Sequence, residues 1–143
     1  MSPINILLVE DNEGDIVLTV DALKDFKYPN IVTVVKDGTE ALKYIERNNN
    51  GSDNNEPDLI LLDVNLPKVN GHEVLKKIKN NDKKKHIPIV MLTTSSSQKD
   101  VLYSYQNHAN CFVTKPVDAQ DFGRVISSIE NFWLTIVQLP KKS

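Results

Sequence analysis

The fold of this chain is decided by the stretch Leu59-Ile60-Leu61-Leu62-Asp63-Val64-Asn65-Leu66-Pro67. Its near-continuous apolar run, bounded by Pro57-Asp58 and Pro67, predicts a strand that is buried on both faces, as in the middle of a parallel sheet. Asp63 stands where this strand should end, and the ligands of open α/β sheets bind beyond the carboxyl ends of the strands. Taken alone, Asp63 could also be an ordinary turn or capping residue, so its role depends on which other residues reach the same edge.

Apolar runs and helical patterns alternate along the rest of the chain. We predict strands at residues 4–9, 31–35, 59–63, 87–92 and 110–114. We predict helices at residues 13–27, after residue 38, from about residue 72, at residues 98–107 and from residue 118 onward. Because each strand is followed by a helix, right-handed crossovers force a parallel sheet with helices on both faces. The predicted fold class is α/β, with a doubly wound five-stranded parallel sheet.

Size, charge and cysteine content narrow the class of protein. The 143 residues, 40% hydrophobic and 25% charged, suit one domain with a full core, which we expect to span residues 1–143. A net charge of −2 provides no basic surface for nucleic acid or for an anionic membrane. The single cysteine and the lack of a leader or a long apolar run lead us to expect a cytoplasmic protein without nucleic-acid or membrane contacts.

Polar residues follow three other predicted strands, at the edge where Asp63 is expected. The first strand ends in Glu10-Asp11, the fourth in Thr93 and the fifth in Lys115. If the strand order is 2-1-3-4-5, the order of flavodoxin-like sheets, these side chains converge with Asp63 in one shallow cleft.

Such a set has a defined chemistry. Carboxylates a few Å apart repel one another, so either one holds a proton or a cation lies among them. Oxygen ligands alone favour a hard cation, Mg²⁺ by preference. The Lys115 charge and the Thr93 hydroxyl suit the oxygens of a phosphoryl group held on Asp63. Together these residues indicate phosphoryl transfer onto an aspartate.

Five motifs between residues 4 and 130 resemble the marker motifs of two-component response-regulator receiver domains. These motifs are Val9-Glu10-Asp11-Asn12, Leu62-Asp63-Val64-Asn65-Leu66-Pro67, Asn70-Gly71, Leu92-Thr93-Thr94 and Thr114-Lys115-Pro116. The chain departs from the family pattern at two places. Thr94 stands where a smaller residue is common, which would narrow the access of an attacking water, and Gly71 follows Asn70 instead of the more usual Asp.

The resemblance implies a role for each matching residue. Asp63 would accept a phosphoryl group from a sensor histidine kinase, and Lys115 would pair with that group. Thr93 would follow it inward, and the switch aromatic Phe112 would turn from exposed to buried. The implied Mg²⁺ ligands are the side chains of Glu10, Asp11 and Asp63 and the backbone carbonyl of Asn65.

The last predicted helix carries an apolar stripe that is longer than one face of a small sheet needs. We expect residues 131–143 to extend this helix and to form part of a homodimer interface. Its predicted residues are Phe122, Phe132, Trp133, Ile136 and Val137. The alternative is that this end folds back on its own domain. Residues 130–140 also resemble the tail of single-domain regulators that pair with cyanobacterial phytochrome kinases, which implies a phytochrome-type kinase partner.

Plain structural roles remain possible for single residues. Glu10 and Asp11 could begin a helix, a residue between Thr93 and Ser97 could cap one, and Lys115-Pro116 could form a turn. Phe112 could be a core residue. The histidines, which lack metal-ligand spacing, and the stretch Lys83-Lys84-Lys85-His86 are expected at the solvated surface.

Other functions compete with the receiver interpretation. A haloacid-dehalogenase-type phosphatase would need an aspartate where Asn65 stands, a P-loop NTPase would need a glycine-rich phosphate loop, and Glu10-Asp11 would repel a flavin phosphate. The alternative that stays open is a degenerate receiver that binds partners without phosphorylation. We predict a stand-alone response regulator of a phosphorelay, a phosphoacceptor rather than an enzyme, that signals through protein contacts.

Overall fold

The computed structural model describes residues 3–47, 56–94, 97–116 and 118–132. Its sheet is parallel and five-stranded, in the order β2-β1-β3-β4-β5. The strands are β1 (Ile4–Val9), β2 (Asn30–Val35), β3 (Leu59–Leu62), β4 (Ile89–Thr93) and β5 (Cys111–Thr114). The predicted α/β class and the predicted strand order are therefore confirmed.

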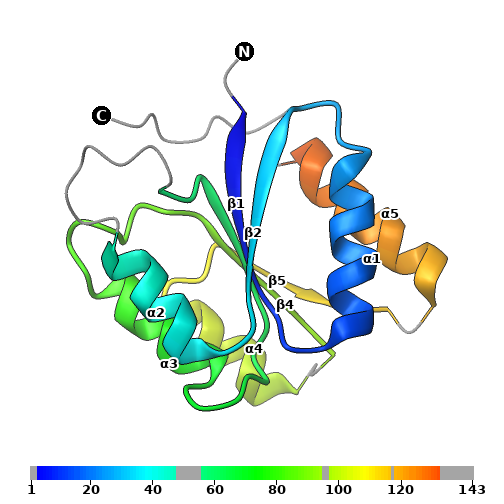
Figure 1. Cartoon of the computed structure of the whole chain (residues 1–143). Helices are drawn as coiled ribbons and strands as arrows, with labels where there is room; N and C mark the ends of the chain where they lie inside the picture. Colours follow the sequence, from blue (N-terminus) through cyan, green and yellow to red (C-terminus); the bar gives the residue numbers. More distant parts are fainter. Residues whose placement is uncertain (1–2, 48–55, 95–96, 117, 133–143) are drawn as a thin grey trace.

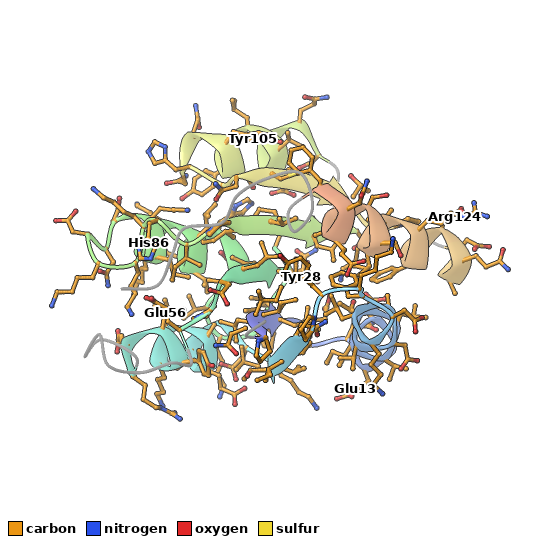
Figure 2. The ribbon with its side chains drawn as sticks, turned by 90° about the horizontal axis from the view of Figure 1, so that it is seen from above. Glu13, Tyr28, Glu56, His86, Tyr105 and Arg124 are labelled. Carbon is orange, nitrogen blue, oxygen red and sulfur yellow. The ribbon has the colours of Figure 1, made fainter. Side chains whose placement is uncertain are left out.

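Helices cover both faces of the sheet. One face carries α1 (Glu13–Lys24) and α5 (Ala119–Glu130), and the other carries α2 (Gly38–Arg47), α3 (Gly71–Lys79) and α4 (Gln98–Gln106) (Figure 1). Seen from above, the strands form the middle layer, and side chains fill the space on either side of it (Figure 2). This is the doubly wound arrangement that alternating strands and helices require.

The central strand β3 supplies both halves of the core. Leu59 and Leu61 pack with the α1 and α5 side, whereas Ile60 and Leu62 pack with the α2 and α3 side. All of them are at most 1% exposed. Because successive side chains of a strand point to opposite faces, an unbroken apolar run is what a strand buried on both sides needs.

Strand register brings the residues after β1 and β3 together. Val9 pairs with Leu62, so Glu10 and Asp63, which follow them, leave the sheet side by side. On the other side of β3, Leu62 pairs with Met91 of β4. Thr93 of β4 pairs with Thr114, the last residue of β5. Residues from four parts of the chain thus reach one edge of the sheet.

Side chains cap the helices that start at this edge. Asn12, Asn70, Ser97 and Asp118 each accept hydrogen bonds from backbone N–H groups in the first turn of α1, α3, α4 and α5. Such caps satisfy N–H groups that have no partner within the helix. Ser97 is therefore the capping residue that was expected after β4.

The structure corrects several predicted bounds. Helix α1 ends at Lys24 rather than 27, with Asp25 as its capping residue, and β4 begins at Ile89 rather than 87. Helix α5 runs to Glu130 with Asn131 as its cap. The predicted continuation through Trp133, Ile136 and Val137 lies outside the described residues. Within the described part of the chain, no helix is both long enough and apolar enough to cross a membrane.

Two residues that were expected at the solvated surface are buried fully or in part. Lys84 is only 3% exposed, and its Nζ lies 2.9 Å from Glu56 Oε1. His72 is partly buried; its Nε2 lies 2.9 Å from Asp100 Oδ1, and its ring meets Tyr103 edge-on. Both predictions were wrong because a neighbouring segment that is distant in the sequence covers the side chain. His86 and His108 are exposed, as predicted.

Candidate functional site

Three carboxylates meet at the carboxyl edge of the sheet. Glu10, Asp11 and Asp63 each offer one oxygen, and these oxygens lie within 4.8 Å of one another. Glu10 is 2% exposed and Asp63 is 7% exposed, whereas Asp11 is open to solvent. The predicted convergence of the acidic residues is therefore present, and it joins two buried carboxylates with an exposed one.

Lys115 enters this cluster from the loop between β5 and α5. Its ammonium group donates a hydrogen bond to Glu10 Oε1, and its Nζ lies 3.0 Å from Asp63 Oδ2 and 3.0 Å from Asp15 Oδ2. The backbone N–H of Lys115 also donates to the carbonyl of Thr93, 2.8 Å away. A turn residue needs no such partners, so Lys115 is a buried member of the site.

Burial and charge shift the protonation of this cluster in a defined direction. Burial raises the pKa of Glu10 to about 7, and the Asp63 charge adds to this effect while Lys115 opposes it. Burial alone would lower the pKa of Lys115, but its bonds to Glu10 and Asp63 outweigh burial and raise that pKa above its ordinary value. At neutral pH, Lys115 is charged and Glu10 holds a proton for part of the time.

The donor set fits a hard divalent cation. All of its ligand atoms are oxygens, and a cation among them would offset the repulsion that the single Lys115 charge leaves uncompensated. Glu10 is also oriented by the backbone N–H groups of Asp11 and Asn12, which donate to Oε2 over 3.1 and 3.2 Å. When bound, such an ion supplies charge neutralisation and a template for phosphate oxygens.

The loop after β3 is held against the site by hydrogen bonds and close packing. The backbone N–H of Asn65 donates to Asp63 Oδ1 over 3.1 Å, and Gly71 donates to the carbonyl of Val64 over 2.8 Å. A Cβ atom on Gly71 would lie only 2.0 Å from the carbonyl oxygen of Asp63. Only glycine therefore fits where α3 begins behind Asp63. The role of the Asn65 carbonyl stays a prediction.

Thr93 and Phe112 occupy neighbouring strands. Thr93 is fully buried at the end of β4, next to the site, whereas Thr94 is exposed. Phe112 is half-buried on β5 and packs at the border of the core on the α2 and α3 side. Its backbone N–H donates to Tyr105 Oη of α4 over 3.2 Å. The aromatic ring is thus neither fully exposed nor part of the deep core.

The predicted dimer residues fall into different surroundings. Phe122 is 2% exposed in the core under α5, so it stabilises its own domain and offers no surface to a partner. Phe132 is 51% exposed. It borders an apolar groove of about 330 Å³ on the β5 and α5 side, which Val113, Val125 and Ile129 also line. The other predicted residues, Trp133, Ile136 and Val137, lie outside the described residues.

Sequence reasoning missed one member of the site, Asp15. It lies in the first turn of α1, four residues after Asp11, and its Oδ2 contacts Lys115 Nζ. The signal in the sequence was weak, because an acidic residue in a first turn is also favoured by the helix dipole alone.

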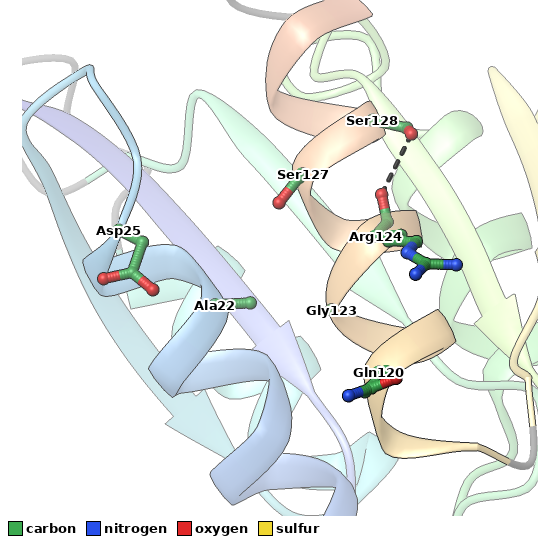
Figure 3. A pocket seen from close by; sticks show the side chains of 7 residues that line it. All are labelled: Ala22, Asp25, Gln120, Gly123, Arg124, Ser127 and Ser128. Atoms are coloured by element: carbon green, nitrogen blue, oxygen red, sulfur yellow. Dashed lines mark hydrogen bonds between the residues drawn. The ribbon is translucent and has the colours of Figure 1, made fainter.

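Another groove lies away from the acidic cluster. A groove of about 680 Å³ runs between α1 and α5 and is lined by Ala22, Asp25, Gln120, Gly123, Arg124, Ser127 and Ser128 (Figure 3). Within it, the Ser128 hydroxyl donates to the carbonyl of Arg124 over 2.9 Å. None of the carboxylates of the acidic cluster lines this groove, so its size does not make it the reactive site.

Comparisons with known proteins agree with this geometry. The family model described as "Response regulator receiver domain" matches residues 6–127. Response regulator Rcp1 of Synechocystis sp. (strain ATCC 27184 / PCC 6803 / Kazusa) is 42% identical over 135 residues, which cover 94% of this chain and 92% of Rcp1.

Two solved structures are similar over almost the whole chain. The phosphorylated cyanobacterial phytochrome response regulator RcpA has a TM-score of 0.92 and 41% identity, and the match covers 98% of this chain and 100% of RcpA. The Mn²⁺-bound form of Rcp1 has a TM-score of 0.90 and 41% identity, with 97% of this chain and 100% of Rcp1 covered. On the shared fold, the acidic cluster and these matches, the chain belongs to the response regulator receiver domain family.

Proposed function

We propose that this chain is a phosphorelay response regulator that accepts a phosphoryl group on Asp63 in a Mg²⁺-dependent reaction. The observation that carries the proposal is the contact of Lys115 Nζ with Asp63 Oδ2, 3.0 Å apart, beside two further carboxylates. A nucleophilic carboxylate, a cation site and a buried ammonium are the parts that phosphoryl transfer onto an aspartate needs.

The transfer itself is an in-line displacement at phosphorus. An Asp63 carboxylate oxygen forms the new P–O bond while the P–N bond of a phosphohistidine breaks, and the electron pair of that bond stays on the imidazole nitrogen. Lys115 neutralises charge on the phosphoryl oxygens. Glu10, Asp11 and Asp63, with the Asn65 carbonyl, would hold Mg²⁺ beside them. The chain assists its own phosphorylation and dephosphorylation but turns over no separate substrate.

Thr93 and Phe112 are the proposed switch. Thr93 is buried beside the site and can donate its hydroxyl to a phosphoryl oxygen. Phe112 lies one strand away, half-buried and linked through its backbone N–H to Tyr105 of α4. Movement of Thr93 toward the phosphoryl group would leave space that the Phe112 ring enters, so the α4 and β5 surface changes shape. That surface would carry the signal to a partner protein.

The proposed donor is a sensor histidine kinase, and a phytochrome-type kinase is the finer proposal. It is supported by the similarity to RcpA, which is described as a cyanobacterial phytochrome response regulator. We further propose that residues 1–143 form one cytoplasmic receiver domain, with residues 131–143 extending the last helix. This domain would signal through protein contacts and would form a homodimer around Phe132, Trp133, Ile136 and Val137.

Acetyl phosphate tests the proposed function directly. With Mg²⁺ present, intact-mass spectrometry should show the gain of one phosphoryl group, and the Asp63→Asn variant should show none. Chelation of the divalent ions should suppress the gain in the wild-type protein. If neither acetyl phosphate nor phosphoramidate modifies the wild-type protein, the chain is a degenerate receiver that binds partners without phosphorylation.

A further inference from the structure

Lys115 has three carboxylate partners, and only two of them belong to the candidate metal cluster. The ammonium group carries three hydrogens, and the structure directs them to Glu10, Asp63 and Asp15. Glu10 and Asp63 also supply oxygens to the cluster, whereas Asp15 does not. Among the described residues, Asp15 is therefore the partner that contacts the site through Lys115 alone.

The contacts of Lys115 with Glu10 and Asp63 must change during phosphoryl transfer. The inference drawn from this change rests on the proposed function. Once Asp63 carries a phosphoryl group, its carboxylate charge is lost and Lys115 must turn to a phosphoryl oxygen. A cation held by the acidic cluster would compete with Lys115 for Glu10. We propose that Asp15 is a positioning residue that keeps Lys115 Nζ beside Asp63 while its two other partners change.

Backbone hydrogen bonds hold Asp15 in place, so that its carboxylate can anchor Lys115. Its N–H donates to Asn12 Oδ1 over 2.9 Å, and its carbonyl accepts from Thr19 Oγ1 over 2.7 Å. Both contacts lie within the first turns of α1, so they fix the Cα position without using the Asp15 carboxylate. The carboxylate is free to reach Lys115, a residue 100 positions further along the chain. The contact thereby joins the start of α1 to the end of β5.

Asp15 could instead slow phosphorylation, which is the opposite of the effect that anchoring of Lys115 would have. Asp15 adds a fourth carboxylate near the incoming phosphoryl group, and like charges repel. If repulsion dominated, removal of the Asp15 charge would speed phosphorylation, whether alanine or asparagine replaced it. If anchoring dominates, the outcome depends on the hydrogen-bond acceptor, because Asn retains an oxygen that can accept from Lys115 whereas Ala does not.

The experiment measures the rate of phosphorylation by acetyl phosphate at saturating Mg²⁺, as a function of donor concentration. We expect Asp15→Ala to lower the limiting rate about tenfold, and Asp15→Asn to lower it less than about threefold, because misplacement of a charged group costs transition-state stabilisation. Asp21→Ala is the matched control, since Asp21 is an exposed aspartate on the same helix, and its Oδ1 lies 3.8 Å from Lys24 Nζ. It should leave the rate unchanged.

A double-mutant cycle shows whether Asp15 acts through Lys115. In a Lys115→Met background, Asp15→Ala should have no further effect on the rate that remains. The capping bond uses the backbone N–H of Asp15, so the helix start should survive both substitutions, and urea unfolding of each variant checks this. An equal loss of rate in both backgrounds would overturn the role assigned to Asp15.

The remaining outcomes separate this inference from the proposed function. A wild-type protein that takes up no phosphoryl group from any donor defeats the proposed function. A wild-type protein that is phosphorylated, together with an Asp15→Ala variant of equal or higher rate, defeats the anchoring role alone.

Discussion

At the scale of single residues, the unusual feature is a buried glutamate with its pKa raised to about 7. Its ordinary value is 4.5, so between these values the folded protein binds more protons than the unfolded chain. The free energy of unfolding therefore falls as pH rises through this window, when no cation is bound. The site thus costs stability at neutral pH, as functional clusters of like charge commonly do.

Glu10→Gln tests this cost, because glutamine has the shape of the protonated acid and does not ionise. In the presence of a chelator, we expect the variant to be more stable than the wild type at pH 8, by roughly 1–3 kcal/mol. At pH 5 the two proteins should have nearly equal free energies of unfolding. Urea titrations at both pH values measure the difference in free energy of unfolding between the variant and the wild type. Contributions of other titrating groups that are common to both proteins cancel in this difference. An equal difference at the two pH values would contradict the raised pKa of Glu10.

At the scale of secondary-structure elements, the helix starts determine the shape of the site. Helix α3 can begin directly behind Asp63 because Gly71 has no Cβ. A Cβ added there would lie 2.0 Å from the Asp63 carbonyl oxygen. The same holds at the start of α2, where a Cβ on Gly38 would lie 1.8 Å from the carbonyl oxygen of Val69. Gly123 in the middle of α5 differs, since a Cβ there would meet no atom within 4 Å.

Alanine at Gly71 and alanine at Gly123 should therefore have opposite effects on the free energy of unfolding. We expect Gly71→Ala to lower the free energy of unfolding by about 3 kcal/mol or more, because backbone atoms must shift, and to impair phosphorylation of Asp63. Gly123→Ala should raise the free energy of unfolding by about 0.5–1 kcal/mol, since alanine is the better helix former. Urea unfolding and acetyl phosphate labelling of both variants check this. Stabilisation by Gly71→Ala would show that the close approach is not required.

At the scale of the whole molecule, an apolar groove lies on the β5 and α5 side of the sheet. Phe132 is exposed beside the groove formed by β5 and α5. Ile31 has a similar exposed fraction of 53% but lies on β2, at the opposite edge strand. The two residues therefore offer a matched test of which side associates.

Sedimentation equilibrium, with and without Mg²⁺ and beryllofluoride, measures the association constant. We expect Phe132→Ser to weaken dimerisation at least about tenfold, as loss of a buried aromatic anchor does at interfaces, and Ile31→Ser to leave it unchanged. A higher association constant with beryllofluoride would couple dimerisation to phosphorylation. Equal weakening by both substitutions would remove the α5 side as the interface.

The sequence by itself determined the elements and the main chemistry. The unbroken apolar run before Asp63 predicted a central strand, because such a strand buries both faces. Carboxyl ends of parallel strands share one edge, so the meeting of Glu10, Asp11 and Lys115 with Asp63 was predictable once the strand order 2-1-3-4-5 was assumed. These features depend on local periodicity and on chain order, which a single sequence contains.

Only the tertiary structure decided which long side chains meet and which become buried. Lys115 contacts Asp15 across 100 positions, Lys84 pairs with Glu56, and His72 lies against α4. None of these contacts follows from a local pattern, because an exposed and a buried lysine look alike in the sequence. Such contacts are set by the register of the sheet and the packing of helices on it, and the contact between Lys115 and Asp15 changes the charge balance beside Asp63.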